Sequence, residues 1–351
     1  MTGLLADSSA ASKPILRDAN DVRTSLRGVL DALCHGIGQA NGPGNAEEVA
    51  KFTALAEDVR VSMAERIPPE LQRLSFLGNV ARDTALAAAR SGKAAQAEEA
   101  LLRARNSVAG YEPELTRFAD TLTEAVAAYV DYKQQRFPEA RAGLELSLDA
   151  TNRMMTDYRC EKMQLRRVHL VANIVRMGAR NGDAAGALDI ASGILSYLEG
   201  DEASWPLPGY EVASPIAAIP LEHRVMLSGT LGGEIALVLS ASSSNLGSVL
   251  GRLAKHASLT SMSATSACAP FRPIHQWLRL RWAHCYGGPD GFLNAARQFF
   301  AVKQPGGFWA DGARLLDRFC APLDVEDAAH IRSTLAAAFV NKTTDMSSIR
   351  L

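Results

Sequence analysis

Apolar residues recur every three or four positions along most of this chain, which is the spacing of amphipathic α-helices. They fall on one helical face from Ile15 to Leu33, and the same spacing predicts further helices at about 46–63 and beyond Pro69. Residues 1–200 contain no run in which apolar and polar residues alternate with the period of two typical of strands. Strong helix formers such as Ala, Leu, Glu, Arg and Gln dominate there. The pattern therefore predicts an all-α protein.

One motif occurs three times, with a helix, a tight turn and a second helix that opens with alanine. The three copies read ALAAARSGKAAQAEEALLRA at 85–104, AYVDYKQQRFPEARAGLELSL at 128–148 and VRMGARNGDAAGALDIASGIL at 175–195. Alignment at the turn places Gly92, Gln135 and Gly182 at one position, and Ala97, Ala140 and Ala187 five residues later. Glycine in a turn permits positive φ, and alanine lets two helix backbones approach closely. We therefore expect three antiparallel helical hairpins.

This motif resembles the tetratricopeptide repeat, whose helical hairpin carries small residues at these places. The segments NGDAAGAL and SGKAAQAEEAL match best, the resemblance covers about residues 78–198, and a weaker copy, GNAEEVAKFTALA, lies at 44–56. The aligned alanines are 43 and 47 residues apart (97 to 140, 140 to 187), whereas the family repeats every 34 or so. The tryptophan and tyrosine of the family's first helix are mostly missing. The resemblance implies a curved stack of hairpins whose first helices line a concave groove for a peptide or a partner helix.

The breaks between helices predict the domain boundaries. Prolines cluster between Trp205 and Pro220, and serine-rich stretches follow at 240–248 and 258–266. We expect a flexible tail at 1–13, a tetratricopeptide-like domain at 14–200, a proline-rich linker at 201–220, a helical C-terminal domain at 221–340 and a flexible tail at 341–351.

The resemblance also indicates which side chains face the groove. The expected groove residues are mostly basic, and they are Arg82, Arg90, Tyr129, Lys133, His169, Arg176 and Arg180. In stacked hairpins they form a basic, partly aromatic stripe that suits a carboxylate-rich segment or a chain terminus. The alternative explanation is that basic residues near a helix C-terminus stabilise the helix dipole without any partner.

Aromatic residues concentrate in the C-terminal third, where RPIHQWLRLRWAHCY occupies 272–286. His275, Trp277, Trp282 and His284 are candidates for a small-ligand pocket. Arginines interleaved with aromatics can also stack nucleic-acid bases, but one apolar and one basic helix face explain the segment as well. The histidines and cysteines lack the close pairing of zinc ligands, so we expect no metal.

Composition narrows the functional classes. The 351 residues are 47% hydrophobic with a formal net charge of -1, which disfavours a main role in neutralising phosphates. Five cysteines, an odd number at wide spacing, indicate free thiols in a reducing compartment. We find no signal peptide and no apolar stretch of about 20 residues that could span a membrane, so we expect a soluble, cytoplasmic protein.

Motifs of common enzymes do not occur. GIGQANG at 36–42 follows a helix instead of a strand, and SGTLGGE at 228–234 lacks the Lys-Ser/Thr of a phosphate loop. We name no catalytic residue and no cofactor, and expect a non-catalytic adaptor, chaperone or regulator that binds a protein or peptide. The alternative is an all-helical enzyme, or an accessory subunit of one, with a ligand site in the C-terminal third. A DNA-binding regulator is less favoured because no helix-turn-helix precedes residue 78.

Overall fold

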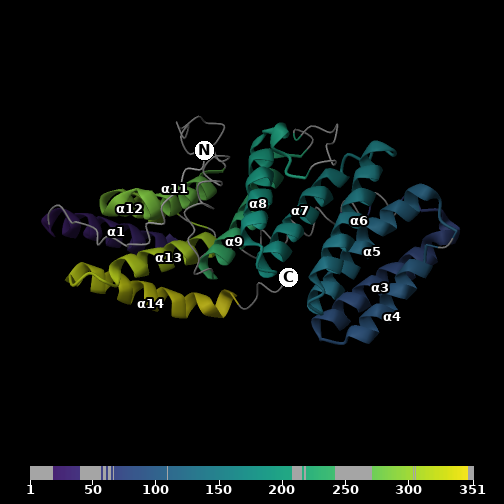
Figure 1. Cartoon of the computed structure of the whole chain (residues 1–351), viewed down its shortest axis with the longest axis horizontal. Coiled ribbons are helices and arrows are strands. Elements are labelled where there is room, and N and C mark those ends of the chain that lie inside the picture. The colour runs from purple at the N-terminus through teal and green to yellow at the C-terminus, as the bar shows by residue number, and fades with distance from the viewer. Residues whose placement is uncertain are drawn as a thin grey trace, which may run out of the picture. The chain divides into compact units, whose positions relative to one another are not determined.

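The computed structural model of the chain describes residues 19–39, 67–108, 110–207, 219–241, 271–302 and 306–346, and the single residues 57, 61, 65, 216 and 304. Every regular element within these ranges is helical (Figure 1), which confirms the all-α prediction for them. The α-helices are α1 (Ala19–Gln39), α3 (Gln72–Arg90), α4 (Ala94–Asn106), α5 (Pro113–Lys133), α6 (Phe137–Thr156), α7 (Met163–Arg180), α8 (Ala184–Glu199), α9 (Leu221–Ala241), α11 (Arg272–Tyr286), α12 (Gly288–Phe300), α13 (Gly306–Cys320) and α14 (Glu326–Met346). The 3-10 helices η1 (Pro69–Leu71) and η2 (Glu202–Ser204) are short.

The helices form two compact units. The hairpin unit contains α3 to α9 and the first turn of α11. The terminal unit contains α1, α11 from Gln276 onwards, α12, α13 and α14. These units differ from the expected boundaries, because α9 belongs with the hairpins and α1 packs on α12 and α14. The local patterns of the sequence contain no signal that α1 packs on the helices α12 and α14, which lie far along the chain. The expected tail at 1–13 and nearly all of the expected helix at 46–63 lie outside the described residues.

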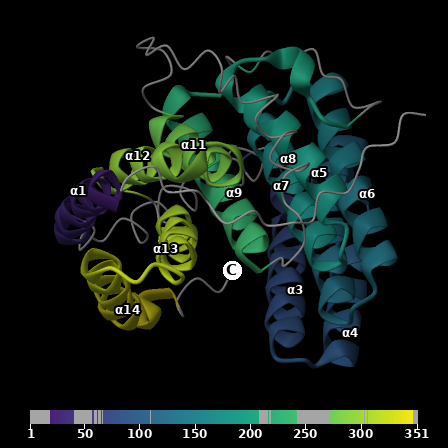
Figure 2. The same cartoon turned by 60° about the vertical axis from the view of Figure 1, so that its left-hand side comes forward.

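The hairpin unit contains the three predicted hairpins α3–α4, α5–α6 and α7–α8, which lie side by side (Figures 1 and 2). Their turns share one geometry, with φ of 72° at Gly92, 62° at Gln135 and 85° at Gly182. In each turn the next N–H donates to a carbonyl five residues earlier, as Lys93 does to Ala88 at 2.9 Å. This is the bond of a Schellman motif, which ends helices at a residue in the left-handed region. The predicted alignment of the three turns is therefore confirmed.

Small residues bring the helices of each hairpin together. Ala97, Ala140 and Ala187 are at most 3% exposed. If a Cβ were added to Gly178 of α7, it would lie 3.4 Å from the Cβ of Ala187. A Cβ added to Gly143 of α6 would lie 3.0 Å from the Cβ of Ala128 on α5. The backbones thus approach too closely at Gly143 for even a methyl group without adjustment.

We expect Gly143→Ala to lower the free energy of unfolding by about 1–3 kcal/mol, because overpacking a close helix crossing forces backbone shifts. Gly229→Ala on α9 is the matched control, since a Cβ there meets nothing within 4 Å. Alanine has less backbone freedom than glycine in the unfolded chain, so this control should leave the free energy of unfolding unchanged or raise it by up to about 1 kcal/mol. Urea unfolding of both variants followed by circular dichroism measures the difference. Equal effects of the two substitutions would contradict the close approach of α5 and α6.

The terminal unit has an aromatic core around one buried polar cluster. Trp277 is fully buried and stacks on Phe308 at 5.0 Å between ring centroids. Its indole Nε1 donates to Asp311 Oδ2 at 2.8 Å, and Arg281 Nε donates to the same oxygen at 2.6 Å. Arg281 Nη2 also donates to Asp311 Oδ1. Asp311 therefore holds two side chains of α11 against α13 inside the core.

Candidate functional site

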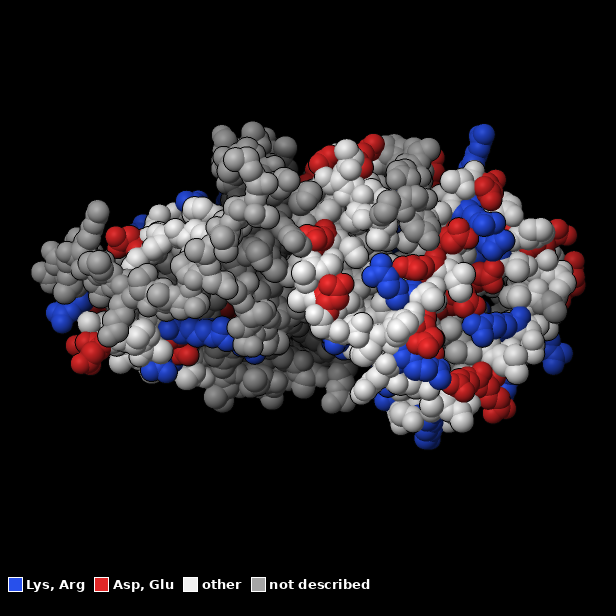
Figure 3. All heavy atoms as spheres, in the orientation of Figure 1, with Lys and Arg blue, Asp and Glu red and all other residues white. Residues whose placement is uncertain are grey.

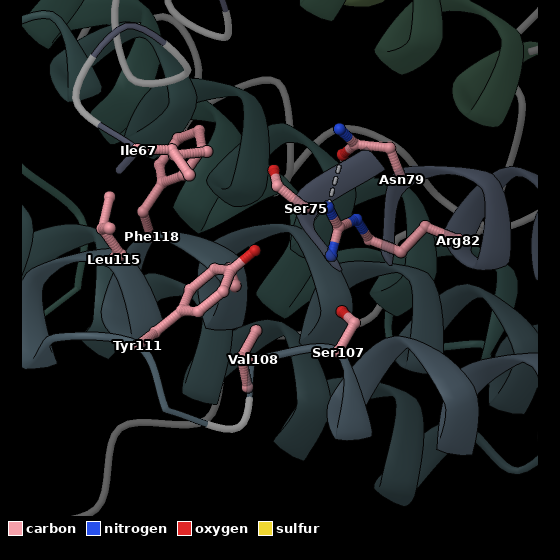
Figure 4. Close-up of a pocket in the computed structure, with 10 residues that line it drawn as sticks. Ile67, Ser75, Asn79, Arg82, Ser107, Val108, Tyr111, Leu115 and Phe118 are labelled. Carbon is pink, nitrogen blue, oxygen red and sulfur yellow. Dashed lines mark hydrogen bonds between the residues drawn. The ribbon is translucent and has the colours of Figure 1, made fainter. Parts of the chain in front are cut away.

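A narrow cavity lies between the first two hairpins of the hairpin unit (Figure 4). Ser75, Asn79 and Arg82 line it from one face of α3, where their spacing of four and three residues places them one above another. The remaining lining residues come from the segment before α3, the α4–α5 connection and the first half of α5, and are Ile67, Ser107, Val108, Tyr111, Leu115, Phe118 and Ala119. Figure 4 shows the polar side chains of α3 on one side and the apolar Ile67, Leu115 and Phe118 on the other.

Arg82 is the charged group of this cavity and is only 8% exposed. Its Nη1 donates to Thr123 Oγ1 of α5 at 3.2 Å, and its Nη2 donates to Asn79 Oδ1 at 2.5 Å. Burial lowers the pKa of the Arg82 guanidinium, although Asp83 and Tyr111 act in the opposite direction. No carboxylate of the described residues forms an ion pair with Arg82. A guanidinium has five donors, so Arg82 keeps donors for a further acceptor beside Asn79 and Thr123.

The close packing of α3 on the α4 C-terminus fixes Arg82 in this position. Gly78 lies one turn before Arg82, and a Cβ there meets Ser107 Oγ at 2.2 Å and Arg82 Nη1 at 3.7 Å. Ser107 Oγ is itself held by donation to the Ala104 carbonyl at 2.6 Å. Glycine at position 78 is therefore required for Ser107 and the Arg82 guanidinium to occupy these positions.

The cavity is small, and its size limits what it can bind. Its volume is about 20 Å³, whereas pockets for drug-sized ligands have volumes of some 300–1,000 Å³. Ser75, Asn79 and Tyr111 are half-exposed, so the cavity has an open side. Its dimensions fit one carboxylate group or a few waters next to Arg82, and they exclude a nucleotide-sized cofactor from the interior.

A second arginine reaches α5 from the opposite neighbour. Arg166 of α7 donates from Nη2 to the Thr121 carbonyl at 2.9 Å, and its buried Nε has no partner among the described residues. Burial lowers the pKa of Arg166 to about 10. Together, Arg82 and Arg166 present guanidinium groups to both flanks of α5.

His169 lies one helical turn after Arg166 on α7. Burial, together with the positive charges of Arg166 and Arg176, lowers the pKa of His169 from 6.5 to about 3. The imidazole is therefore neutral at pH 7. It does not contribute a positive charge to the expected basic stripe.

This shift predicts a pH-dependent stability. Below pH 6.5 the unfolded chain protonates His169 while the folded chain does not, so unfolding takes up a proton. The free energy of unfolding should then fall by about 1.4 kcal/mol per pH unit at most between pH 6.5 and 3. His169→Asn should flatten the slope in this interval when unfolding is measured at several pH values. An unchanged slope in His169→Asn would contradict the lowered pKa of the His169 imidazole.

The other expected groove residues do not converge. Arg90 and Lys133 are exposed at the ends of α3 and α5. Arg180 donates to the Tyr132 hydroxyl and lies 5.6 Å from the centre of its ring. Arg176 donates to Asn173 at 2.8 Å, and Tyr129 packs on the alanine-rich core of α3 to α5. Of the seven residues, only Arg82 lines the cavity.

Acidic side chains are mixed with basic ones on the hairpin unit, as the face in Figure 3 shows. Arg105 pairs with Glu124 at 3.0 Å, and Arg136 pairs with Asp131 and Glu98. Exposed pairs of this kind add little stability. They balance part of the charge on the outer surface, whereas Arg82 and Arg166 form no ion pair with any residue that the structure describes.

The four candidates of the C-terminal third divide over opposite faces of α11. His275 and Trp282 are seven residues apart and share one face, and Trp277 and His284 share the face at about 200° from it. His275 Nε2 lies 2.7 Å from Glu199 Oε1, and Trp277 belongs to the Asp311 cluster. Trp282 is 44% exposed beside Tyr286, and His284 lies edge-on to Phe292. The helix therefore does not bring the four side chains into one pocket.

A wider groove of about 230 Å³ lies between α13 and α14 and is lined by Arg314, Asp317, Arg318, Arg332, Leu335 and Ala336. Its acidic residue, Asp317, already accepts from Arg332 Nε at 2.9 Å. Part of the positive charge of this groove is therefore balanced from within, unlike that of Arg82.

Several residues of the site were not predicted from the sequence, namely Asn79, Thr123 and Arg166. One signal for Arg82 was present in the alignment of the three turns. Arg82 corresponds to Ala125 and Ala172, whereas Arg166 corresponds to Phe76 and Ala119. A long cation where both other hairpins carry alanine marks Arg82 as a side chain that must reach a neighbouring helix.

Two further observations bear on the function. Among the residues that the structure describes, no helix is both long and apolar enough to cross a membrane, and no three His, Cys, Asp or Glu side chains gather as metal ligands. Comparison of the chain with family models, with curated proteins and with solved structures finds no match. The function must therefore be argued from the site itself.

Proposed function

We propose that the hairpin unit is a tetratricopeptide-like binding scaffold for a protein segment that presents a carboxylate, and that Arg82 receives this carboxylate. The observation that carries the proposal is a buried guanidinium with no acidic partner in the described part of the chain. Burying a charge without a counter-ion is costly. A carboxylate from a partner offsets this cost and accepts charge-assisted hydrogen bonds in the fork geometry of arginine.

The surroundings of Arg82 favour a peptide over a small metabolite. The cavity is too small for a typical metabolite. It is open on the side where Ser75, Asn79 and Tyr111 are half-exposed, so it can admit the carboxylate of a longer peptide whose other residues stay outside. Arg166 offers a second cation on the other flank of α5, which suits a segment that crosses several first helices of the hairpins. The role proposed is thus that of an adaptor, chaperone or regulator, and the cytoplasmic location stays a prediction from the cysteine pattern.

The enzyme alternative has less support. Its candidate residues His275, Trp277, Trp282 and His284 lie on opposite faces of α11, and two of them are taken up by contacts with Glu199 and Asp311.

Selection from peptide pools tests the proposal. Immobilised protein is mixed with a heptapeptide pool that is random except for the exclusion of Asp and Glu and ends in a free carboxylate, and with the same pool carrying C-terminal amides. A third pool has amidated ends and one internal glutamate. We expect mass spectrometry to find retention from a carboxylate-bearing pool, weakened by salt. Equal retention of all pools, or retention of none, would contradict the proposal.

A further inference from the structure

Helix α3 carries an exposed apolar stripe. Phe76 of α3 is 64% exposed and Val80 is 45% exposed, and Leu77 is exposed beside them. Ala87 continues the stripe two turns later and is also exposed. These residues lie on one side of α3, away from the buried Ala81, Ala85, Ala88 and Ala89 that pack on α4 and α5.

Most of the same register positions are buried in the next two hairpins. Alignment at the turns matches Phe76, Val80 and Ala87 with Ala119, Thr123 and Val130 of α5, and with Arg166, Leu170 and Met177 of α7. The three α5 residues are at most 6% exposed, and Leu170 and Met177 are at most 5% exposed. In α5, Val130 packs on the α3–α4 hairpin. The stripe on α3 thus occupies the positions that, in the later hairpins, pack on the preceding hairpin.

Contiguous exposed apolar residues commonly mark an interaction surface. The charged neighbours of the stripe make it complementary to itself. Arg73 and Asp83 are exposed at its two ends and have no ion pair among the described residues. If a second α3 lies antiparallel with its two-fold axis at position 78, Arg73 faces Asp83 of the second copy and Phe76 faces Val80. One two-fold axis serves both pairs, because position 78 is midway in sequence between positions 73 and 83 and also between positions 76 and 80.

We propose that this stripe is the interface of a homodimer, in which α3 of one chain packs antiparallel on α3 of a second copy. The pairing covers the apolar residues and joins Arg73 to Asp83 twice by symmetry, which is the arrangement of a closed two-fold interface. Because one helix per chain buries a small area, the dimer dissociates in a micromolar range. This inference is independent of the carboxylate site at Arg82.

Charge reversal tests the pairing. Sedimentation velocity of the full chain at about 1–200 µM should show a species of twice the 37.6 kDa chain mass. In a dimer of the Arg73→Asp variant, both contacts between positions 73 and 83 join two acidic groups. In a dimer of the Asp83→Arg variant, both contacts join two basic groups. Each substitution should weaken the dimer at least about tenfold. An equimolar mixture of the two variants restores both pairs and should form a heterodimer as tight as the wild-type dimer.

Circular dichroism and urea unfolding of each variant establish that it is folded, which is expected because both side chains are exposed. A wild-type chain that stays monomeric up to about 200 µM would overturn the proposal and assign the stripe to another segment of the chain or to a different protein. A dimer that survives both reversals would overturn it as well. So would a mixture that stays as monomeric as the two variants alone.

Discussion

Asp311→Ala should lower the free energy of unfolding by about 3–5 kcal/mol, the expected cost of removing one partner from a buried ion pair. Arg281 and Asp311 are 3% and 2% exposed, and Asp311 also accepts from the indole of Trp277. The substitution leaves a buried guanidinium without its counter-ion and a buried indole N–H without an acceptor. Three of the four tryptophans belong to the terminal unit, so urea unfolding followed by tryptophan fluorescence reports on this core.

Asp317→Ala is the matched control on the same helix. Asp317 accepts from Arg332 at 2.9 Å, but the two side chains are nearly half exposed. Solvent screens such a pair, and its removal should cost less than about 1 kcal/mol. If Asp311→Ala costs no more than Asp317→Ala, the buried cluster is not what holds α11 against α13.

Arg82→Met should weaken binding of the carboxylate-bearing peptides at least about 30-fold, because charge-assisted hydrogen bonds contribute some 1.5–3 kcal/mol each. Methionine keeps much of the length of the arginine stem and removes the buried charge. The free energy of unfolding should therefore stay the same or rise by about 1 kcal/mol, since replacing an uncompensated buried charge by an apolar group is often neutral or stabilising. Isothermal titration and urea unfolding measure the two effects on one preparation.

Arg103→Met on α4 is the control for this variant, because Arg103 is exposed and forms an i,i+4 pair with Glu99 on the same helix. It should leave peptide binding unchanged. Loss of stability together with loss of binding in Arg82→Met would assign Arg82 a structural role, and unchanged binding would remove it from the site.

The hairpins could be predicted from the sequence because their signals are local. A turn residue with positive φ and a buried alanine five residues later are set by neighbouring backbone, and both occur in all three copies. The tetratricopeptide-like superhelix remains part of the proposal.

The site could be predicted only in part, because its contacts are long-range. Arg82 follows from the repeat register, but its acceptor Thr123 lies 41 residues away. The register gave no indication that desolvation and two neighbouring arginines lower the pKa of His169, or that Arg180 donates to the Tyr132 hydroxyl. Likewise, the spacing of Trp277 and Arg281 does not indicate that both donate to a single aspartate, 34 and 30 residues further along. Helical periodicity indicates which face is apolar, but not which polar group meets another inside the fold.

The most direct test of the carboxylate site is the nuclear magnetic resonance signal of the Arg82 side chain, assigned by its loss in Arg82→Met. A peptide recovered from the carboxylate pool is titrated into labelled protein, and its amidated counterpart serves as the control. The proposal predicts that the Arg82 Nε–Hε signal shifts saturably with the carboxylate form and stays in place with the amide. A signal that does not move while backbone signals elsewhere report binding would contradict the assignment of Arg82 as the carboxylate receptor.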